Sequence, residues 1–167
     1  SVSKRYSACG VSIGALISKN KTLMATAMKF AQARLSPPTF GQVAAEAAID
    51  TPEEYFVKVL SEYHERRNLV VTAINGMKGA FCPNPMGAFY VVAKLPVDDS
   101  DRFCQWLLED FSYDGKTVML APATGFYATS GKGLNEVRIS YVLKVQELAE
   151  AMKCLEKAIE VYPGRTD

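Results

Sequence analysis

A lysine at the start of the chain has surroundings that suit covalent chemistry. Lys4 stands in the tetrapeptide Ser1-Val2-Ser3-Lys4, within small and polar residues that end at Gly10. A lysine amine can condense with an aldehyde, and neighbouring hydroxyls can donate hydrogen bonds to a phosphate. A lysine between serines is, however, more often a solvated surface charge. The tetrapeptide by itself leaves both interpretations open.

Arg138 is the second residue with chemical potential. It lies in Asn135-Glu136-Val137-Arg138-Ile139-Ser140-Tyr141, which reads as a strand. A guanidinium offers two parallel donors, which fix the plane of a bound carboxylate. An arginine near a strand end is equally often a plain surface residue. The local sequence does not decide between these two interpretations.

The remaining polar residues give weaker signals. The four cysteines (Cys9, Cys82, Cys104 and Cys154) are widely spaced, and His64 is the only histidine. A zinc site is therefore not expected. Free thiols in a mixed chain favour a reducing, cytoplasmic setting. His64 lies in a charged run and is expected at the surface.

Composition limits the classes of partner. The chain has 167 residues, and 19 Lys and Arg stand against 18 Asp and Glu, with no polybasic run. Nucleic acid and anionic membranes are therefore not expected as partners. The apolar runs are also far shorter than the roughly 20 residues of a membrane helix. The hydrophobic fraction of 49% is enough for a real core.

Caps and periodicity predict the elements that must position Lys4 and Arg138. Cap residues, prolines and helical spacing predict helices at about residues 22–35, 40–49, 51–75, 98–111 and 145–162. Apolar, β-branched and aromatic runs predict strands at about residues 11–18, 88–95, 117–120 and 136–142. The second half thus reads as a two-layer α+β unit, and the first half as mainly helical.

Four short segments form a pattern along the whole chain. They are Ser-x-Ser-Lys at residues 1–4, Pro85-Met86-Gly87-Ala88-Phe89-Tyr90, Met119-Leu120-Ala121-Pro122 with Phe126, and the Arg138 segment at residues 135–141. Each is weak by itself. In this order and at about these spacings they resemble the fold-type I pyridoxal-phosphate aminotransferases, most of all the aspartate and aromatic aminotransferase branch.

This resemblance implies roles for individual residues. Lys4 corresponds to the lysine that binds pyridoxal 5'-phosphate covalently and later moves a proton at the substrate Cα. Such a base needs a lowered amine pKa. Ser1 corresponds to a serine that donates to the cofactor phosphate, and Ser3 is a further hydroxyl beside it. Arg138 corresponds to the arginine that binds the substrate α-carboxylate.

One cofactor-binding position departs from the family pattern. The family has an arginine eight positions after the lysine, as a second anchor for the phosphate, but this chain has Ser12 there. A serine offers one neutral donor where an arginine offers several charged ones. Charge-assisted hydrogen bonds contribute roughly 1.5–3 kcal/mol each, so the change is expected to weaken cofactor binding.

The resemblance also implies an α/β and α+β organisation. Residues 1–50 are expected to be the C-terminal remnant of a large cofactor-binding domain, residues 51–75 a connecting long helix, and residues 76–167 the small α+β domain. The family's residues that hold the cofactor ring precede its lysine. The chain is therefore expected to be a fragment, inactive alone, of a cytoplasmic homodimer that acts on an amino acid and a 2-oxo acid.

Two other interpretations remain. One is a stand-alone α+β domain that binds a partner, in which Lys4 is a plain terminal residue. The other is a related pyridoxal-phosphate lyase or synthase. The abrupt start at Ser1, inside a loop motif, suggests a trimmed or processed chain.

Overall fold

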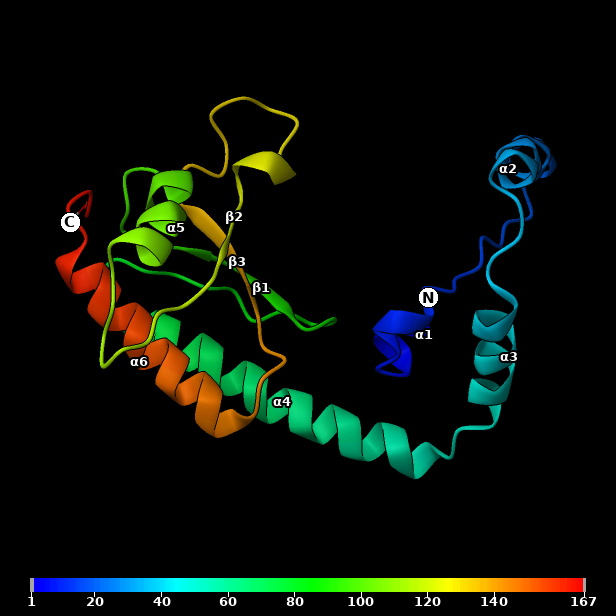
Figure 1. Ribbon diagram of the computed structural model, residues 1–167, viewed down its shortest axis with the longest axis horizontal. Helices are drawn as coiled ribbons and strands as arrows, with labels where there is room; N and C mark the ends of the chain where they lie inside the picture. Colours follow the sequence, from blue (N-terminus) through cyan, green and yellow to red (C-terminus); the bar gives the residue numbers. More distant parts are fainter. Residues whose placement is uncertain (1, 167) are drawn as a thin grey trace. The chain divides into compact units, whose positions relative to one another are not determined.

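The computed structural model describes residues 2–166 (Figure 1). Contacts between Cα atoms divide it into two compact units, Ser1–Phe56 and Val57–Asp167. Each unit is described separately below. Within residues 2–166, no helix combines the length and the apolar composition needed to cross a membrane.

The first unit is helical. It contains α1 (Val2–Arg5), the 3-10 turn η1 (Cys9–Val11), α2 (Lys21–Arg34), α3 (Thr39–Ala47) and η2 (Ala48–Asp50). Asn20 caps α2, because its side chain accepts a hydrogen bond from the Leu23 backbone at 2.9 Å. Among residues 2–56 only Gly41 is buried. Large apolar side chains such as Ile17 and Phe40, 89% and 91% exposed, lie open to solvent.

The strand predicted at residues 11–18 is wrong. Residues 9–11 form η1, and residues 12–18 have no regular structure. An apolar run becomes a strand only where a neighbouring strand satisfies its backbone groups. Among residues 2–56 the structure contains no strand that could do so.

The long helix α4 runs from Glu53 to Gly76, close to the predicted range. It follows Thr51-Pro52, and its first turn carries Glu53 and Glu54, which favour the positive end of the helix dipole. The helix begins in the first unit and continues into the second. There it buries Val70 and Ile74 completely.

The second unit is built on a three-stranded antiparallel sheet in the order β1-β3-β2. The strands are β1 (Tyr90–Lys94), β2 (Ala121–Pro122) and β3 (Glu136–Ser140). Arg138 lies on the central strand, opposite Val92 of β1 and Ala121 of β2. The ladder between β2 and β3 covers only two residue pairs. The strand predicted at residues 117–120 is therefore wrong, because that segment has no ladder partner.

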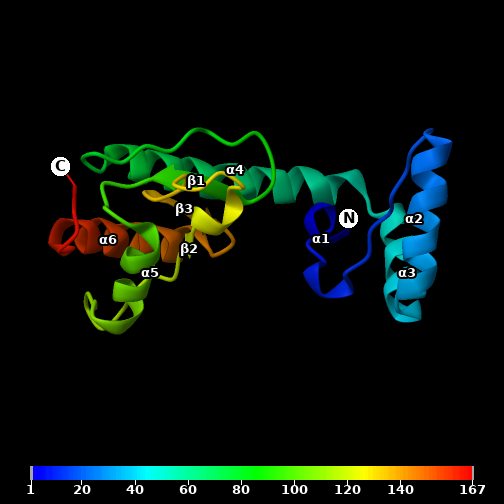
Figure 2. The same cartoon turned by 90° about the horizontal axis from the view of Figure 1, so that it is seen from above.

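Helices cover one face of this sheet. The strands alternate in burial, and Val91, Ala93, Val137 and Ile139 are at most 5% exposed. α4 and α6 (Val145–Val161) lie side by side against this face (Figures 1 and 2). α5 (Ser100–Glu109) lies beside β2 and adds Phe103 and Leu107 to the core. This is the expected two-layer α+β architecture.

The other face of the sheet is more open. Tyr90, Val92 and Lys94 of β1 share it with Arg138 of β3, and all four are half-buried or exposed. Because side chains alternate along a strand, the buried Val137 and Ile139 force Arg138 outward. The open face, not the core, is therefore where Arg138 can meet a ligand.

Candidate functional site

Lys4 lies in the last turn of the short helix α1, and its side chain is exposed. Ser3 precedes it and is half-buried. Ser1 lies outside the described residues. The backbone N–H of Val2 donates to the carbonyl of Ile13 at 3.0 Å, so this helix is tied to the segment after η1.

Ser12 directly follows η1 and is linked to Ser3 of α1 through Cys9. Its hydroxyl is 3.4 Å from the carbonyl of Cys9, and the thiol of Cys9 lies 3.6 Å from the carbonyl of Ser3. Ser12 itself is exposed and has a left-handed backbone conformation, with φ of 52°. Ser3 and Lys4 thus lie on α1 and Ser12 directly follows η1, all in the first unit, whereas Arg138 belongs to the second unit.

Two aromatic rings contact Arg5, the residue after Lys4. The guanidinium carbon of Arg5 lies 4.3 Å from the ring centroid of Phe56, and the rings of Tyr6 and Phe56 meet edge to face at 5.6 Å. Arg5 therefore uses its charge on an aromatic face. Lys4, the residue before it, is exposed.

Arg138 contacts two aromatic rings. Its guanidinium carbon lies 4.9 Å from the ring centroid of Tyr90 and 4.7 Å from that of Phe126, which ends the 3-10 turn η3 (Thr124–Phe126). Within residues 2–166, no carboxylate lies within 4.0 Å of this guanidinium. By contrast, Arg66 and Arg102 each pair with an acid on their own helix or at its start. Arg138 is thus a half-buried cation with its hydrogen-bonding edge available.

The strand that carries Arg138 is fastened at its end by α4. A guanidinium nitrogen of Arg66 donates to the carbonyl of Val142 at 2.7 Å. Tyr141 is 2% exposed, and its hydroxyl donates to the carbonyl of Ala88 at 3.1 Å. Burial raises the pKa of the Tyr141 phenol above its ordinary value. The hydroxyl therefore stays protonated and can keep donating.

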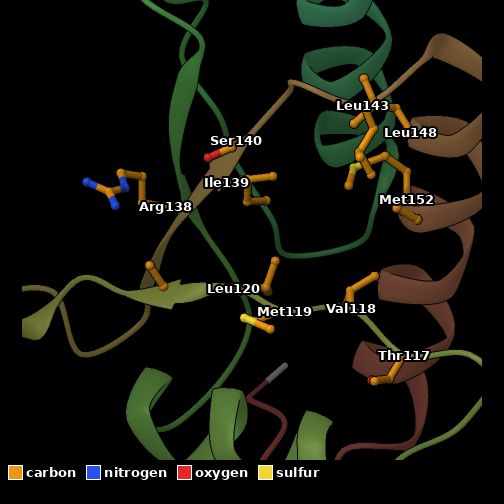
Figure 3. A pocket seen from close by; sticks show the side chains of 12 residues that line it. Thr117, Val118, Met119, Leu120, Arg138, Ile139, Ser140, Leu143, Leu148 and Met152 are labelled. Atoms are coloured by element: carbon orange, nitrogen blue, oxygen red, sulfur yellow. The ribbon is translucent and has the colours of Figure 1, made fainter. Parts of the chain in front are cut away.

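An open apolar cavity of about 400 Å³ lies between β3, α6 and residues 117–121. Leu143, Leu148 and Met152 line one side of it. Arg138 is at its edge, and the guanidinium points away from these apolar side chains (Figure 3). The cavity and the charged edge of Arg138 are therefore two separate surfaces. The irregular backbone of residues 117–120 forms the cavity's other wall.

The weaker candidates carry no chemistry that the structure supports. His64 is exposed, as expected. Cys104 and Cys154 are buried core residues, and burial raises the pKa of the Cys104 thiol to about 11. Such a thiol stays protonated and unreactive at neutral pH. Across residues 2–166 no group of three His, Cys, Asp or Glu side chains is placed to hold a metal ion.

Two residues that contact Arg138 received no role from the sequence. Tyr90 and Phe126 lie inside the motif segments, but their contacts depend on strand register and on the turn η3. Alternation could have found Tyr90, because it shares a sheet face with Arg138 once the register is known. No local pattern predicts that Phe126 contacts Arg138.

Comparisons with known proteins identify the family to which the chain is similar. The family model described as aminotransferase class I and II matches residues 1–155. The aspartate aminotransferase of Pyrococcus horikoshii is 31% identical over 96% of this chain and 40% of its own length. The solved aspartate aminotransferase of Thermotoga maritima superposes with a TM-score of 0.76 and 30% identity, over 95% of this chain and 38% of its own.

A differently named enzyme shares the same fold. The alanine aminotransferase from Pyrococcus furiosus matches with a TM-score of 0.75 and 27% identity, over 93% of this chain and 40% of that enzyme. The chain thus spans about 40% of the length of the relatives it matches. Because the family model covers nearly the whole chain, the fold and motifs have one common explanation: the chain belongs to the class I and II aminotransferases.

Proposed function

We propose that the chain is the C-terminal part of a pyridoxal-phosphate-dependent aminotransferase that moves an amino group between an amino acid and a 2-oxo acid. The observation that carries this proposal is the family match over residues 1–155. Relatives named aspartate aminotransferase and alanine aminotransferase support the reaction class. Their different names leave the amino-acid side chain unassigned.

In this proposal three segments of the chain belong to different parts of the enzyme. Residues 1–50 belong to a large cofactor-binding domain, residues 51–75 connect, and residues 76–167 form the small domain. The exposed apolar side chains of the first unit, such as Ile17 and Phe40, support burial against further protein. The parent enzyme would be a cytoplasmic homodimer.

The residues around Lys4 fit an aldehyde that carries a phosphate. Lys4 would hold pyridoxal 5'-phosphate through its amine, and Ser1 and Ser3 would donate hydrogen bonds to the phosphate. When bound, this group supplies an electron-withdrawing ring that stabilises negative charge at the substrate Cα. The exposed position of the Lys4 side chain supports the assignment, because a small molecule can reach the amine.

Lys4 would also move the proton. Its Nζ must be unprotonated to accept a proton from the substrate Cα and return it elsewhere. Ser12 would contribute one neutral hydroxyl where relatives have a cation. Cofactor retention therefore depends more on Ser1, Ser3 and the covalent link at Lys4.

Arg138 would bind the substrate carboxylate. Its half-buried guanidinium has no acidic partner among residues 2–166, so its donors are available for an incoming anion. Two parallel N–H groups fix the plane of a carboxylate and thereby orient the Cα–H bond. The position on the central strand supports this role, because β1 and β2 restrain it from both sides.

A chimera tests the proposal. The chain would replace the matched portion of the Thermotoga maritima aspartate aminotransferase, of which it covers 38%. We expect transfer of the amino group from aspartate to 2-oxoglutarate, and loss of that transfer in Lys4→Ala. Arg138→Ala should lower kcat/KM by about 100-fold or more, because two charge-assisted hydrogen bonds are lost.

Lys19→Ala is the matched control, since Lys19 is another exposed lysine of the first unit. It should leave transfer unchanged. A chimera that folds but transfers no amino group contradicts the proposed function. Full activity in the Arg138→Ala chimera contradicts the assigned carboxylate site.

A further inference from the structure

Resting on the proposed role of Arg138, we propose that Tyr90 and Phe126 are positioning residues for its guanidinium. They orient the planar guanidinium so that its N–H groups face an incoming ligand. The class of ligand selected is a planar carboxylate that approaches in the plane of the guanidinium. Ligands that bind by stacking on the face of the cation are disfavoured, because aromatic rings already contact it.

The contacts of Arg138 are the first support. The guanidinium carbon lies over both rings, at 4.9 Å from the Tyr90 centroid and 4.7 Å from the Phe126 centroid. A cation over an aromatic ring is attracted to the ring's negative face. Two such contacts restrict the rotamers of a long, flexible side chain. Arg138 is then already ordered in the folded protein, so ligand binding does not carry the entropic cost of ordering this side chain.

Strand register places Tyr90. Arg138 pairs with Val92, and Tyr90 pairs with Ser140, so Tyr90 is the diagonal neighbour of Arg138 on the same face of the sheet. Diagonal neighbours lie about 7–8 Å apart, within reach of an aromatic side chain. The Tyr90 ring also contacts Phe89, whose centroid is 4.6 Å away. Tyr90 is therefore set by the sheet itself.

The turn that carries Phe126 is fastened to the strand of Arg138. The backbone N–H of Ala123 donates to the carbonyl of Glu136 at 3.0 Å, and the Thr124 hydroxyl donates to Asp101 at 2.6 Å. Gly133 lies against Ala123, where a Cβ atom would come within 2.8 Å of the Ala123 carbonyl. The half-exposed Phe126 is thus held by backbone contacts and not by the core.

The nearest acid on the same strand face is engaged elsewhere. The hydroxyl of Tyr127 donates to the carboxylate of Glu136, and this hydrogen bond raises the pKa of Tyr127 above its ordinary value. Glu136 is two residues from Arg138 on β3, yet it does not pair with it. The segment from Thr124 to Tyr127 therefore keeps the ring of Phe126 near Arg138 and holds the carboxylate of Glu136 away from it.

The test measures carboxylate binding on the full chain by NMR of the Arg138 side-chain N–H group, with 2-oxoglutarate as the probe and chloride at matched ionic strength as the control. Assignment uses Arg138→Ala. We expect the wild-type signal to move with the probe. Phe126→Leu should weaken the apparent affinity by about threefold to tenfold and reduce the ring-current shift of the free protein, because the Tyr90 ring remains.

Two further variants separate positioning from a structural effect. Phe126→Tyr keeps the ring and should restore both the affinity and the chemical shift. Phe81→Leu removes an aromatic side chain that is 60% exposed and does not lie over Arg138, and it should change neither. Because Phe126 is 52% exposed, the leucine variant is expected to fold. Tyr90→Leu should repeat the Phe126→Leu result.

The outcomes distinguish the two proposals. If the Arg138 signal of the wild type does not shift on addition of 2-oxoglutarate, the proposed function is contradicted. A wild-type signal that responds, together with unchanged affinity in Phe126→Leu and Tyr90→Leu, overturns the positioning role alone. Equal loss of affinity in Phe126→Leu and Phe126→Tyr also overturns it, because the ring would then not be the cause.

Discussion

Tyr162 should make the second unit sensitive to alkaline pH. Its ring packs against Phe103 and Trp106, it is 8% exposed, and its hydroxyl donates to Asp98 at 3.1 Å. Burial, followed by the hydrogen bond to Asp98, raises the pKa of Tyr162 to about 12. An unfolded tyrosine has a pKa of about 10. The folded state therefore favours the protonated phenol, and this stability is present below pH 10 and lost as pH rises through 12.

The size of the effect follows from these two pKa values. Linkage gives a loss of about 1.3 kcal/mol between about pH 9 and pH 11, out of a total of about 2.7 kcal/mol. Urea unfolding of the full chain at both pH values, at matched ionic strength, measures this difference. Tyr162→Phe removes the titrating group. The free energy of unfolding of this variant should therefore fall by about 1.3 kcal/mol less than that of the wild type between about pH 9 and pH 11.

Tyr127→Phe is the matched control. Tyr127 also donates to an acid, but it is 43% exposed, so solvent screens its interaction. Removal of the Tyr127 hydroxyl should change the fall in the free energy of unfolding between about pH 9 and pH 11 far less than removal of the Tyr162 hydroxyl. If Tyr162→Phe loses as much stability as the wild type over the same pH range, the buried phenol is not the source and the reasoning fails.

Three further predictions concern Tyr141, Ser12 and the activity of the chain by itself. Tyr141→Phe should lower the free energy of unfolding by about 1–2 kcal/mol in urea titrations, because the Ala88 carbonyl loses its donor; an unchanged midpoint would contradict this. Ser12→Arg in the chimera should slow cofactor dissociation and gain roughly 1–3 kcal/mol of binding, whereas equal or faster dissociation would mean that another group fills the site. The 167-residue chain alone should transfer no amino group from aspartate or tyrosine to 2-oxoglutarate, and turnover by contaminant-free protein would refute that.

Local signals predicted the helices well. Asn20 caps α2, whereas Thr51, which precedes α4, donates its hydroxyl to the carbonyl of Ala48 and does not cap that helix. Strands were less predictable, because a strand needs a partner that the local sequence does not name. Residues 11–18 and 117–120 have apolar, strand-like composition but no ladder. The central strand β3 and its neighbour β1 were found near their true limits.

The candidate site divides in the same way. Lys4 and Arg138 stand out through motif order, and their roles stay predictions. Tyr90 and Phe126 could not be assigned from the sequence, because one depends on strand register and the other on a turn fastened to Glu136. Contacts of this kind are set by tertiary structure.

Covalent trapping shows whether Lys4 is the residue that binds pyridoxal phosphate. The chimera, incubated with substoichiometric pyridoxal phosphate, would be reduced with borohydride, digested and mapped by mass spectrometry. The aminotransferase account predicts that the reduced adduct lies on Lys4, and that it is absent from the Lys4→Ala chimera. An adduct spread over exposed lysines such as Lys19 and Lys21, and unchanged in Lys4→Ala, would contradict the account.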